Sequence, residues 1–213
     1  MRIRNHAGST LFVVAASALA IGLGATTALA STSTLTVKVT GGGSYTASSS
    51  KTVLTDNGVS VTCTGSKASG SIPTKTYSNA TTPVTVGTSA KLSFSGCTGP
   101  LGAVTVKVNK LPYKVQTDSK TNSKGQTDGM ISGANTSVSM TGCSFNVTGS
   151  APGYYTNGSH TLTLTPKLPN KALNKAQLTI SGVSGCSGLV NNGDHPAYTS
   201  TYTLSRAFVV KAS

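Results

Sequence analysis

The residues that could carry out acid–base catalysis are few in this chain of 213 residues. All of its acids are aspartates, and two histidines lie beyond residue 30: Asp56, Asp118, Asp128, Asp194, His160 and His195. Glycoside cleavage needs two opposed carboxyl groups, and a hydrolase triad needs a serine, a histidine and an acid in contact. Asp194 and His195 are neighbours, but consecutive strand residues point to opposite faces, and the sequence has no G-x-S-x-G nucleophile motif. Catalysis is therefore not expected, and a secreted hydrolase that uses Asp194 and His195 is the last alternative.

Metal-binding chemistry is also not predicted. Each aspartate has turn-forming neighbours, which favours hydrogen bonds from its side chain to the backbone of a turn. The segment from Asp118 to Asp128 lacks the closing Glu of a calcium loop and has Lys120 at a ligand position. We expect neither a metal nor a cofactor.

Tyrosine rings are the remaining groups that could bind a ligand, because the chain has seven tyrosines and no tryptophan. Tyr113 follows Leu-Pro, and Tyr154 and Tyr155 follow Pro-Gly, which places all three near strand ends or loops. They are the candidate ligand-binding residues. In the alternative interpretation, the tyrosines cover the edge of a thin core and keep their hydroxyls in water.

The four cysteines are predicted to form two disulfide bonds. They are an even set without the C-x-x-C spacing of a tetrahedral metal site: Cys63, Cys97, Cys143 and Cys186. Four cysteines allow three pairings. Residues 90–99 resemble residues 176–188, and this local repeat favours the pairs Cys63–Cys97 and Cys143–Cys186. Reactive thiols are the alternative, but no charged cluster surrounds any of the cysteines to activate it.

Residues 1–30 have the layout of a secretory signal peptide. Arg2 and Arg4 give a positive start, residues 11–24 are apolar, and Ala28-Leu29-Ala30 fits a small-residue cleavage site. The apolar run is too short to span a bilayer comfortably, so no membrane span is expected. We predict a secreted, extracellular protein of residues 31–213, with association with the cell surface as a further expectation.

The exported part is strongly basic. Fifteen basic residues remain against four aspartates, a net charge of +11, and all of the basic residues except Arg206 are lysines. Nucleic-acid readers rely on the planar guanidinium, so nucleic acid is not an expected partner. The lysines are scattered singly, which favours a solubilising coat. The alternative is attraction to anionic cell-envelope polymers or extracellular polysaccharide.

The periodicity of the apolar residues is that of β-strands. Leu35, Val37 and Val39 alternate with threonine and lysine, and the same two-residue period recurs along the chain. Turn signals such as Asp56-Asn57-Gly58 and Asp128-Gly129 separate the runs. The pattern predicts an all-β fold with almost no helix, either an antiparallel β-sandwich (jelly-roll or Ig-like) or a small barrel. Residues 31–213 are expected to form one domain, with two pseudo-repeats, 31–112 and 113–213, as the competing description.

Several short motifs carry a family resemblance. They are Val61-Thr62-Cys63-Thr64, Phe94-Ser95-Gly96-Cys97-Thr98-Gly99-Pro100, Leu111-Pro112-Tyr113-Lys114, Cys143-Ser144-Phe145, Ser184-Gly185-Cys186-Ser187-Gly188-Leu189, Gly193-Asp194 and Thr201-Tyr202-Thr203. Together with the export signal, they resemble small secreted β-rich proteins of actinomycete type, whose function is not settled. The layout is more distantly similar to exported activators of alkane oxidation, which would imply hydrocarbon handling or surface association. Tyr113 stands where both groups usually have Trp after Leu-Pro.

These observations favour a non-catalytic secreted or surface-associated protein with a structural, adhesive or interaction role. The first alternative is a binding module for a hydrophobic ligand or an anionic envelope glycan. The sequence does not specify the ligand or the oligomeric state.

Overall fold

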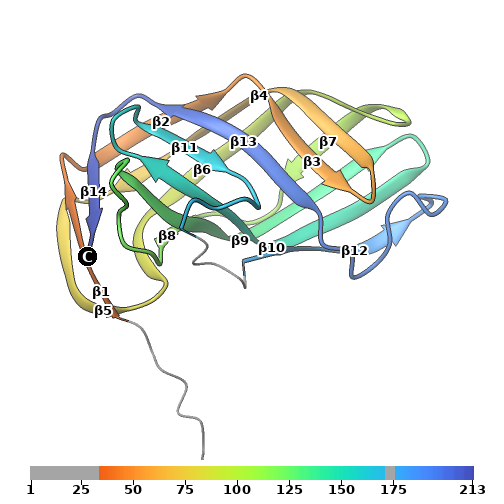
Figure 1. Ribbon diagram of the computed structural model, residues 1–213. Helices are drawn as coiled ribbons and strands as arrows, with labels where there is room; N and C mark the ends of the chain where they lie inside the picture. The colour runs from red at the N-terminus through yellow and green to blue at the C-terminus, as the bar shows by residue number, and fades with distance from the viewer. Residues whose placement is uncertain (1–33, 171–175) are drawn as a thin grey trace, which may run out of the picture. The chain divides into compact units, whose positions relative to one another are not determined.

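The computed structural model describes residues 34–170 and 176–213, and the predicted signal peptide 1–30 lies outside the described residues. The described residues form fourteen strands and no helix (Figure 1). The strands are β1 (Thr34–Thr40), β2 (Gly43–Ser49), β3 (Thr52–Asp56), β4 (Val59–Ile72), β5 (Lys75–Thr81), β6 (Val84–Gly99), β7 (Gly102–Val108), β8 (Tyr113–Thr117), β9 (Gln126–Met140), β10 (Cys143–Thr156), β11 (Thr161–Leu164), β12 (Leu178–Ser184), β13 (Ala197–Leu204) and β14 (Val209–Ala212). None of the described segments is a helix long and apolar enough to cross a membrane.

Eleven strands form one large antiparallel sheet that nearly closes into a ring. Its order is β12-β10-β11-β13-β2-β4-β6-β7-β9-β8, and β3 pairs with both β13 and β4. Further pairings join β9 to β10 and β6 to β8, which brings the two ends of the order together. In Figure 1, β4 and β13 cross the upper side of the ring and β9 and β10 cross the lower side. The predicted all-β antiparallel fold is confirmed, and the ring is closer to a small barrel than to a sandwich of two separate sheets.

The three remaining strands form a small sheet, in the order β14-β1-β5, at one end of the ring (left in Figure 1). Alternation along β1 explains why this sheet packs there: Leu35, Val37 and Val39 are buried, whereas Lys38 and Thr40 are exposed. The buried face joins ring residues in one apolar cluster. A second cluster fills the other end of the ring and includes all four cysteines.

Both predicted disulfides are present, in the pairing that the local repeat favours. Cys63 of β4 is bonded to Cys97 of β6, directly opposite it in the sheet. Cys143 at the start of β10 is bonded to Cys186, which follows β12. All four cysteines are buried, and no free cysteine remains. The cross-links therefore fasten one end of the ring.

One of the predicted turns is present and another is not. Asn57 and Gly58 join β3 to β4 with φ angles of 45° and 84°, as a tight hairpin turn requires. The turn predicted at Asp128-Gly129 is wrong, because both residues lie inside β9, and Asp128 is 0 % exposed. The strand continues there because the carboxylate of Asp128 has partners from a distant segment, the backbone N–H and side-chain amide of Asn170. Whether residues 31–112 and 113–213 are pseudo-repeats stays a prediction.

Candidate functional site

The interior of the ring contains a cavity of about 170 Å³. Residues of both apolar clusters border it, so the cavity lies between them. Its wall comes from the inward positions of many strands and is almost wholly apolar; Val86, Leu92, Ile131 and Leu162 are representative. Alternate residues of each strand point to the same side, so the apolar residues of all of the strands can face the interior of the ring. The interior is therefore apolar although the sequence is rich in polar residues.

Two glycines of the cavity wall let neighbouring strands approach closely. Gly129 of β9 and Gly153 of β10 face each other in the sheet, and both border the cavity. No side chain projects from this part of the wall. A methyl group at Gly153 would meet Leu164 at 2.7 Å, and one at Gly129 would meet the carbonyl of Gln116. Neither position therefore has room for a larger residue.

The three tyrosines singled out in the sequence all border the cavity. Tyr113 is buried, and its hydroxyl donates to the Asn135 carbonyl at 3.1 Å. Tyr155 is also buried; its hydroxyl donates to the Phe208 carbonyl at 2.8 Å, and its ring stacks on that of Phe208 at 4.7 Å. Burial raises the pKa of Tyr155 to about 12. Tyr154 is partly exposed.

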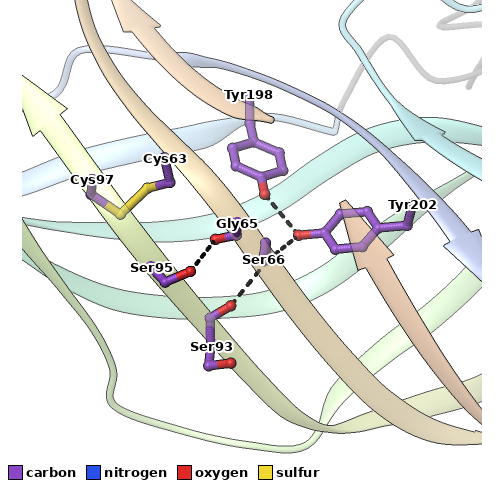
Figure 2. The surroundings of a disulfide bond; sticks show 8 residues. All are labelled: Cys63, Gly65, Ser66, Ser93, Ser95, Cys97, Tyr198 and Tyr202. Atoms are coloured by element: carbon purple, nitrogen blue, oxygen red, sulfur yellow. Dashed lines mark hydrogen bonds between the residues drawn. A yellow bond between two sulfur atoms is a disulfide. The ribbon is translucent and has the colours of Figure 1, made fainter. Parts of the chain in front are cut away.

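Two further tyrosines, which the sequence did not single out, belong to a chain of hydroxyl groups (Figure 2). Tyr198 and Tyr202 border the cavity, and their hydroxyl oxygens lie 3.0 Å apart. The Tyr202 hydroxyl lies 2.7 Å from Ser66 Oγ, which donates to the Ser93 carbonyl at 3.1 Å. Because Ser66 uses its proton on Ser93, Tyr202 donates to Ser66, and Tyr198 in turn donates to Tyr202. Their spacing was the available signal, since residues four apart in a strand share a face.

These contacts determine what the cavity offers a ligand. The hydroxyl protons of Tyr113, Tyr155, Tyr198 and Tyr202 are all donated to protein groups. Burial also raises the pKa of Tyr198 well above its ordinary value, so this phenol stays neutral. The tyrosines therefore present ring faces to the cavity and keep their polar ends in the wall. Such a lining suits a molecule without charge.

Asp194 and His195 lie at the opposite end from the small sheet, but their side chains have separate partners. Asp194 accepts hydrogen bonds from the Asn191 backbone N–H at 2.7 Å and from the Asn57 side chain at 3.3 Å. His195 Nδ1 lies 3.0 Å from the Leu178 carbonyl and 3.4 Å from the Thr179 hydroxyl. No hydrogen bond between Asp194 and His195 is found in the described part of the chain. His195 thus contacts a hydroxyl, that of Thr179, but Asp194 is bonded elsewhere, and these contacts do not form a triad.

Asp56, predicted from the sequence only as a turn residue, is the carboxyl group whose surroundings most resemble those of a catalytic acid. It is buried at the end of β3. Burial, with a hydrogen bond and the charge of Asp194, raises its pKa to about 6. The pKa of Asp194 is lowered, chiefly because the Asn191 N–H donates to it. Asp56 and Asp194 are thus one carboxyl pair with opposite shifts.

Asp118 and Asp128 form a second carboxyl pair, beside β8 and β9. Burial, with the charge of Asp128, raises the pKa of Asp118 to about 7, and Asp118 Oδ1 is buried without a hydrogen-bond partner. The Ser119 hydroxyl donates to the Lys120 carbonyl at 3.3 Å and not to this atom, and its Oγ accepts from the Asp128 N–H at 2.9 Å. Within residues 34–170 and 176–213, no three His, Cys, Asp or Glu side chains gather in a way that could hold a metal ion.

Comparison of the chain with known protein families, with curated proteins and with solved structures gave no significant match.

Proposed function

We propose that this protein is a non-catalytic, exported binding protein that holds a small apolar molecule inside its ring of strands. The cavity of about 170 Å³ is the observation that carries the proposal. Its lining is apolar, and its tyrosine hydroxyls are occupied by protein groups. A polar or charged ligand would lose its hydration without gaining partners there, whereas an apolar ligand loses nothing on entry.

The size of the cavity limits the ligand. A cavity of about 150 Å³ lined by Leu, Ile and Phe can bind benzene, so this one suits a single ring or a short hydrocarbon chain. Burial of each methylene contributes about 0.8 kcal/mol, so six to eight carbons would contribute about 5–6 kcal/mol. This binding free energy corresponds to a dissociation constant of about 0.1 mM. We therefore expect modest affinity and rapid exchange.

Export is part of the proposal and has two supports. Residues 1–30 have the layout of a signal peptide, and disulfides persist mainly in oxidising compartments outside the cytosol. The absence of catalysis is supported by the separate partners of Asp194 and His195. A protein of this kind would carry or sequester its ligand outside the cell.

Titration of the purified, oxidised protein with toluene and hexane, followed by calorimetry or by chemical-shift changes of cavity residues, tests the proposal. Ala151→Leu adds three carbons at a buried position that borders the cavity, and Ala47→Leu does so from β2. We expect either change to weaken binding at least about tenfold, because it fills the space. Ala103→Leu is the matched control, since Ala103 is exposed on β7.

The result depends on comparison of these variants, each shown to be folded by circular dichroism. Saturable binding that is lost in Ala151→Leu or Ala47→Leu and kept in Ala103→Leu would support the proposal. Absence of binding by the unaltered protein at near-saturating hydrocarbon, or equal binding by all of the variants, would contradict it.

A further inference from the structure

Two lysines face each other on the outer side of the small sheet. Lys38 of β1 and Lys211 of β14 are directly opposite partners in the strand register, and both are exposed. Side chains at such positions begin about 5 Å apart, and like charges placed there destabilise the pairing of the strands. A negatively charged group close to both lysines would remove this repulsion.

None of the four aspartates supplies that group. They form two pairs elsewhere, Asp56 with Asp194 and Asp118 with Asp128. Within residues 34–170 and 176–213, neither Lys38 nor Lys211 forms an ion pair. The two ammonium groups are therefore left to solvent or to a ligand.

Further positive groups border the same sheet. The Thr121 N–H donates to the Ala212 carbonyl at 2.9 Å, which places the exposed Lys120 beside β14. At the end of β1, the exposed Arg206 donates to the carbonyls of Gly41 and Gly42 at 3.3 and 3.4 Å. Positive charge thus extends from the lysine pair toward Lys120 beside β14 and toward Arg206 at the end of β1.

Hydroxyl groups flank the lysine pair. Thr76 of β5 is the partner of Lys38 on its other side, and Thr36 and Thr40 precede and follow Lys38 by two residues on β1. Residues two apart in a strand share a face, so these threonines lie on the same outer side as Lys38. The result is a narrow surface with ammonium groups at its centre and hydroxyls around them.

We propose that this outer face of the β14-β1-β5 sheet docks an acidic polysaccharide, with carboxylates on Lys38 and Lys211 and sugar hydroxyls on Thr36, Thr40 and Thr76. The hydroxyls favour a glycan over a bare polyphosphate, because each can donate to a sugar oxygen and accept from a sugar hydroxyl. Lysine at the centre also favours this ligand, because phosphate recognition gains most from the planar guanidinium of Arg. This inference does not depend on the cavity.

Retention on immobilised polygalacturonate at low and high salt tests the inference, with the full chain in its oxidised form. Lys38→Gln combined with Lys211→Gln should weaken binding roughly tenfold, since two exposed charge contacts are lost. The matched control is Lys67→Gln combined with Lys91→Gln, which removes two exposed lysines from β4 and β6 of the ring. We expect less than a twofold change in that control, and we expect salt to abolish the binding in every case.

Two further variants separate a specific surface from a general effect. Lys38→Arg with Lys211→Arg should keep binding, because the charge is kept. Thr36→Val with Thr76→Val should weaken binding to polygalacturonate and leave binding to polyphosphate unchanged. Removal of the repulsion should leave the glutamine variant at least as stable as the unaltered protein.

Three outcomes would overturn the inference. The first is an unaltered protein that does not bind polygalacturonate at low salt. The second is equal loss of binding in the Lys38/Lys211 and Lys67/Lys91 variants, which would mean a diffuse positive coat. The third is binding to polyphosphate as tight as to polygalacturonate with no effect of the threonine changes, which would mean recognition of charge alone.

Discussion

Asp118 shows how far the environment of one residue departs from what its sequence neighbours indicate. The residues around it, Thr117 to Gly129, are polar and suggest an exposed loop, yet Asp118 is half-buried, with its Oδ1 buried, and close to Asp128. Nothing in the local sequence indicates that Asp128, ten positions away, will be its neighbour. The strand register that joins β8 to β9 creates the pair, so only the folded chain reveals it.

Replacement of Asp118 with Asn should stabilise the protein at neutral and higher pH. The carboxyl pKa of about 7 in the folded protein lies above its ordinary value of 3.8, so protonation favours folding. Its contribution to stability is fully present below pH 4 and is lost as the pH rises through 7. At pH 8, Asp118→Asn should therefore raise the free energy of unfolding by about 2–4 kcal/mol, at 1.4 kcal/mol per pKa unit. Urea unfolding at pH 3.5 and pH 8 measures this.

The pH 3.5 measurement is the internal control, because Asp118 is then neutral in the folded protein and mostly neutral in the unfolded chain, so the two proteins should unfold nearly alike. Asp56, whose pKa is raised to about 6, should keep part of the acid-side stability in the variant, with loss between pH 4 and pH 6. A variant no more stable than the unaltered protein at pH 8 would show that Asp118 is not destabilised by its burial.

The candidate ligand residues could be predicted only in part. Tyr113 and Tyr155, predicted near strand ends or loops, border the cavity from buried positions, and their contact with a ligand stays a prediction. Tyr198 and Tyr202 also border the cavity but were not predicted, because their partner Ser66 lies more than 130 positions away. Local spacing identifies a shared strand face, but the closure of the ring decides which face is inside.

At the scale of the strands, the alternation predicted the type of structure but not the lengths. The ring depends on four strands of 14 to 16 residues, β4, β6, β9 and β10, where the sequence suggested shorter ones. Glycines and serines inside them resemble turn signals. They remain extended because hydrogen bonds to neighbouring strands on both sides outweigh the weak local preference.

The edge of β14 is a second feature of the elements that the sequence does not show. One side of this short strand pairs with β1, and its other side is covered by Asn157. The Asn157 side chain donates to the Val210 carbonyl at 2.9 Å and accepts from the Val210 N–H at 2.8 Å. Thr121 covers the next groups along the strand, because its hydroxyl accepts from the Ala212 N–H at 2.8 Å and its own N–H donates to the Ala212 carbonyl at 2.9 Å. Asn157 and Thr121 thus replace a neighbouring strand and protect an edge that could otherwise pair with another chain.

Replacement of Asn157 with Ala should loosen β14 and with it the small sheet. The buried Val210 N–H would lose its partner, and the Val210 carbonyl would keep only the longer bond from the Thr121 hydroxyl at 3.4 Å, at a cost of about 1–3 kcal/mol. Faster hydrogen exchange at the Val210 and Ala212 amides, together with a lower midpoint of thermal unfolding, would show this. Asn109→Ala is the control, since its side chain also makes two hydrogen bonds but is exposed. Equal effects of the two changes would contradict the role given to Asn157.

The whole molecule separates its charges in an unusual way. Every lysine that the structure describes is exposed, whereas three of the four aspartates are buried or hold a buried carboxyl oxygen. The acids lie in two pairs, Asp56 with Asp194 and Asp118 with Asp128. Net charge was evident from the composition, but this arrangement was not, because it depends on contacts between residues far apart in the chain.

The two disulfides should stabilise the molecule by similar amounts but affect different parts of it. Their loops span 34 and 43 residues, and the chain-entropy estimate gives about 4 kcal/mol for each. Cys63 and Cys97 lie on strands that also pair along much of their length, so their loss should lower global stability without local opening. Cys186 follows β12 outside any strand, and the segment after it covers the edge of β12 through the bonds of Ile180 with Gly193 and Asp194.

Comparison of the Cys63→Ala/Cys97→Ala and Cys143→Ala/Cys186→Ala variants tests this difference. Both should unfold at lower urea concentration, by a similar loss of free energy. Only the second should show faster hydrogen exchange at the Ile180 and Gly193 amides under conditions in which the rest of the ring stays closed, because only it releases the covering segment. If both variants lost protection evenly around the ring, the ring would open as one cooperative unit, and the local role assigned to the Cys143–Cys186 bond would be wrong.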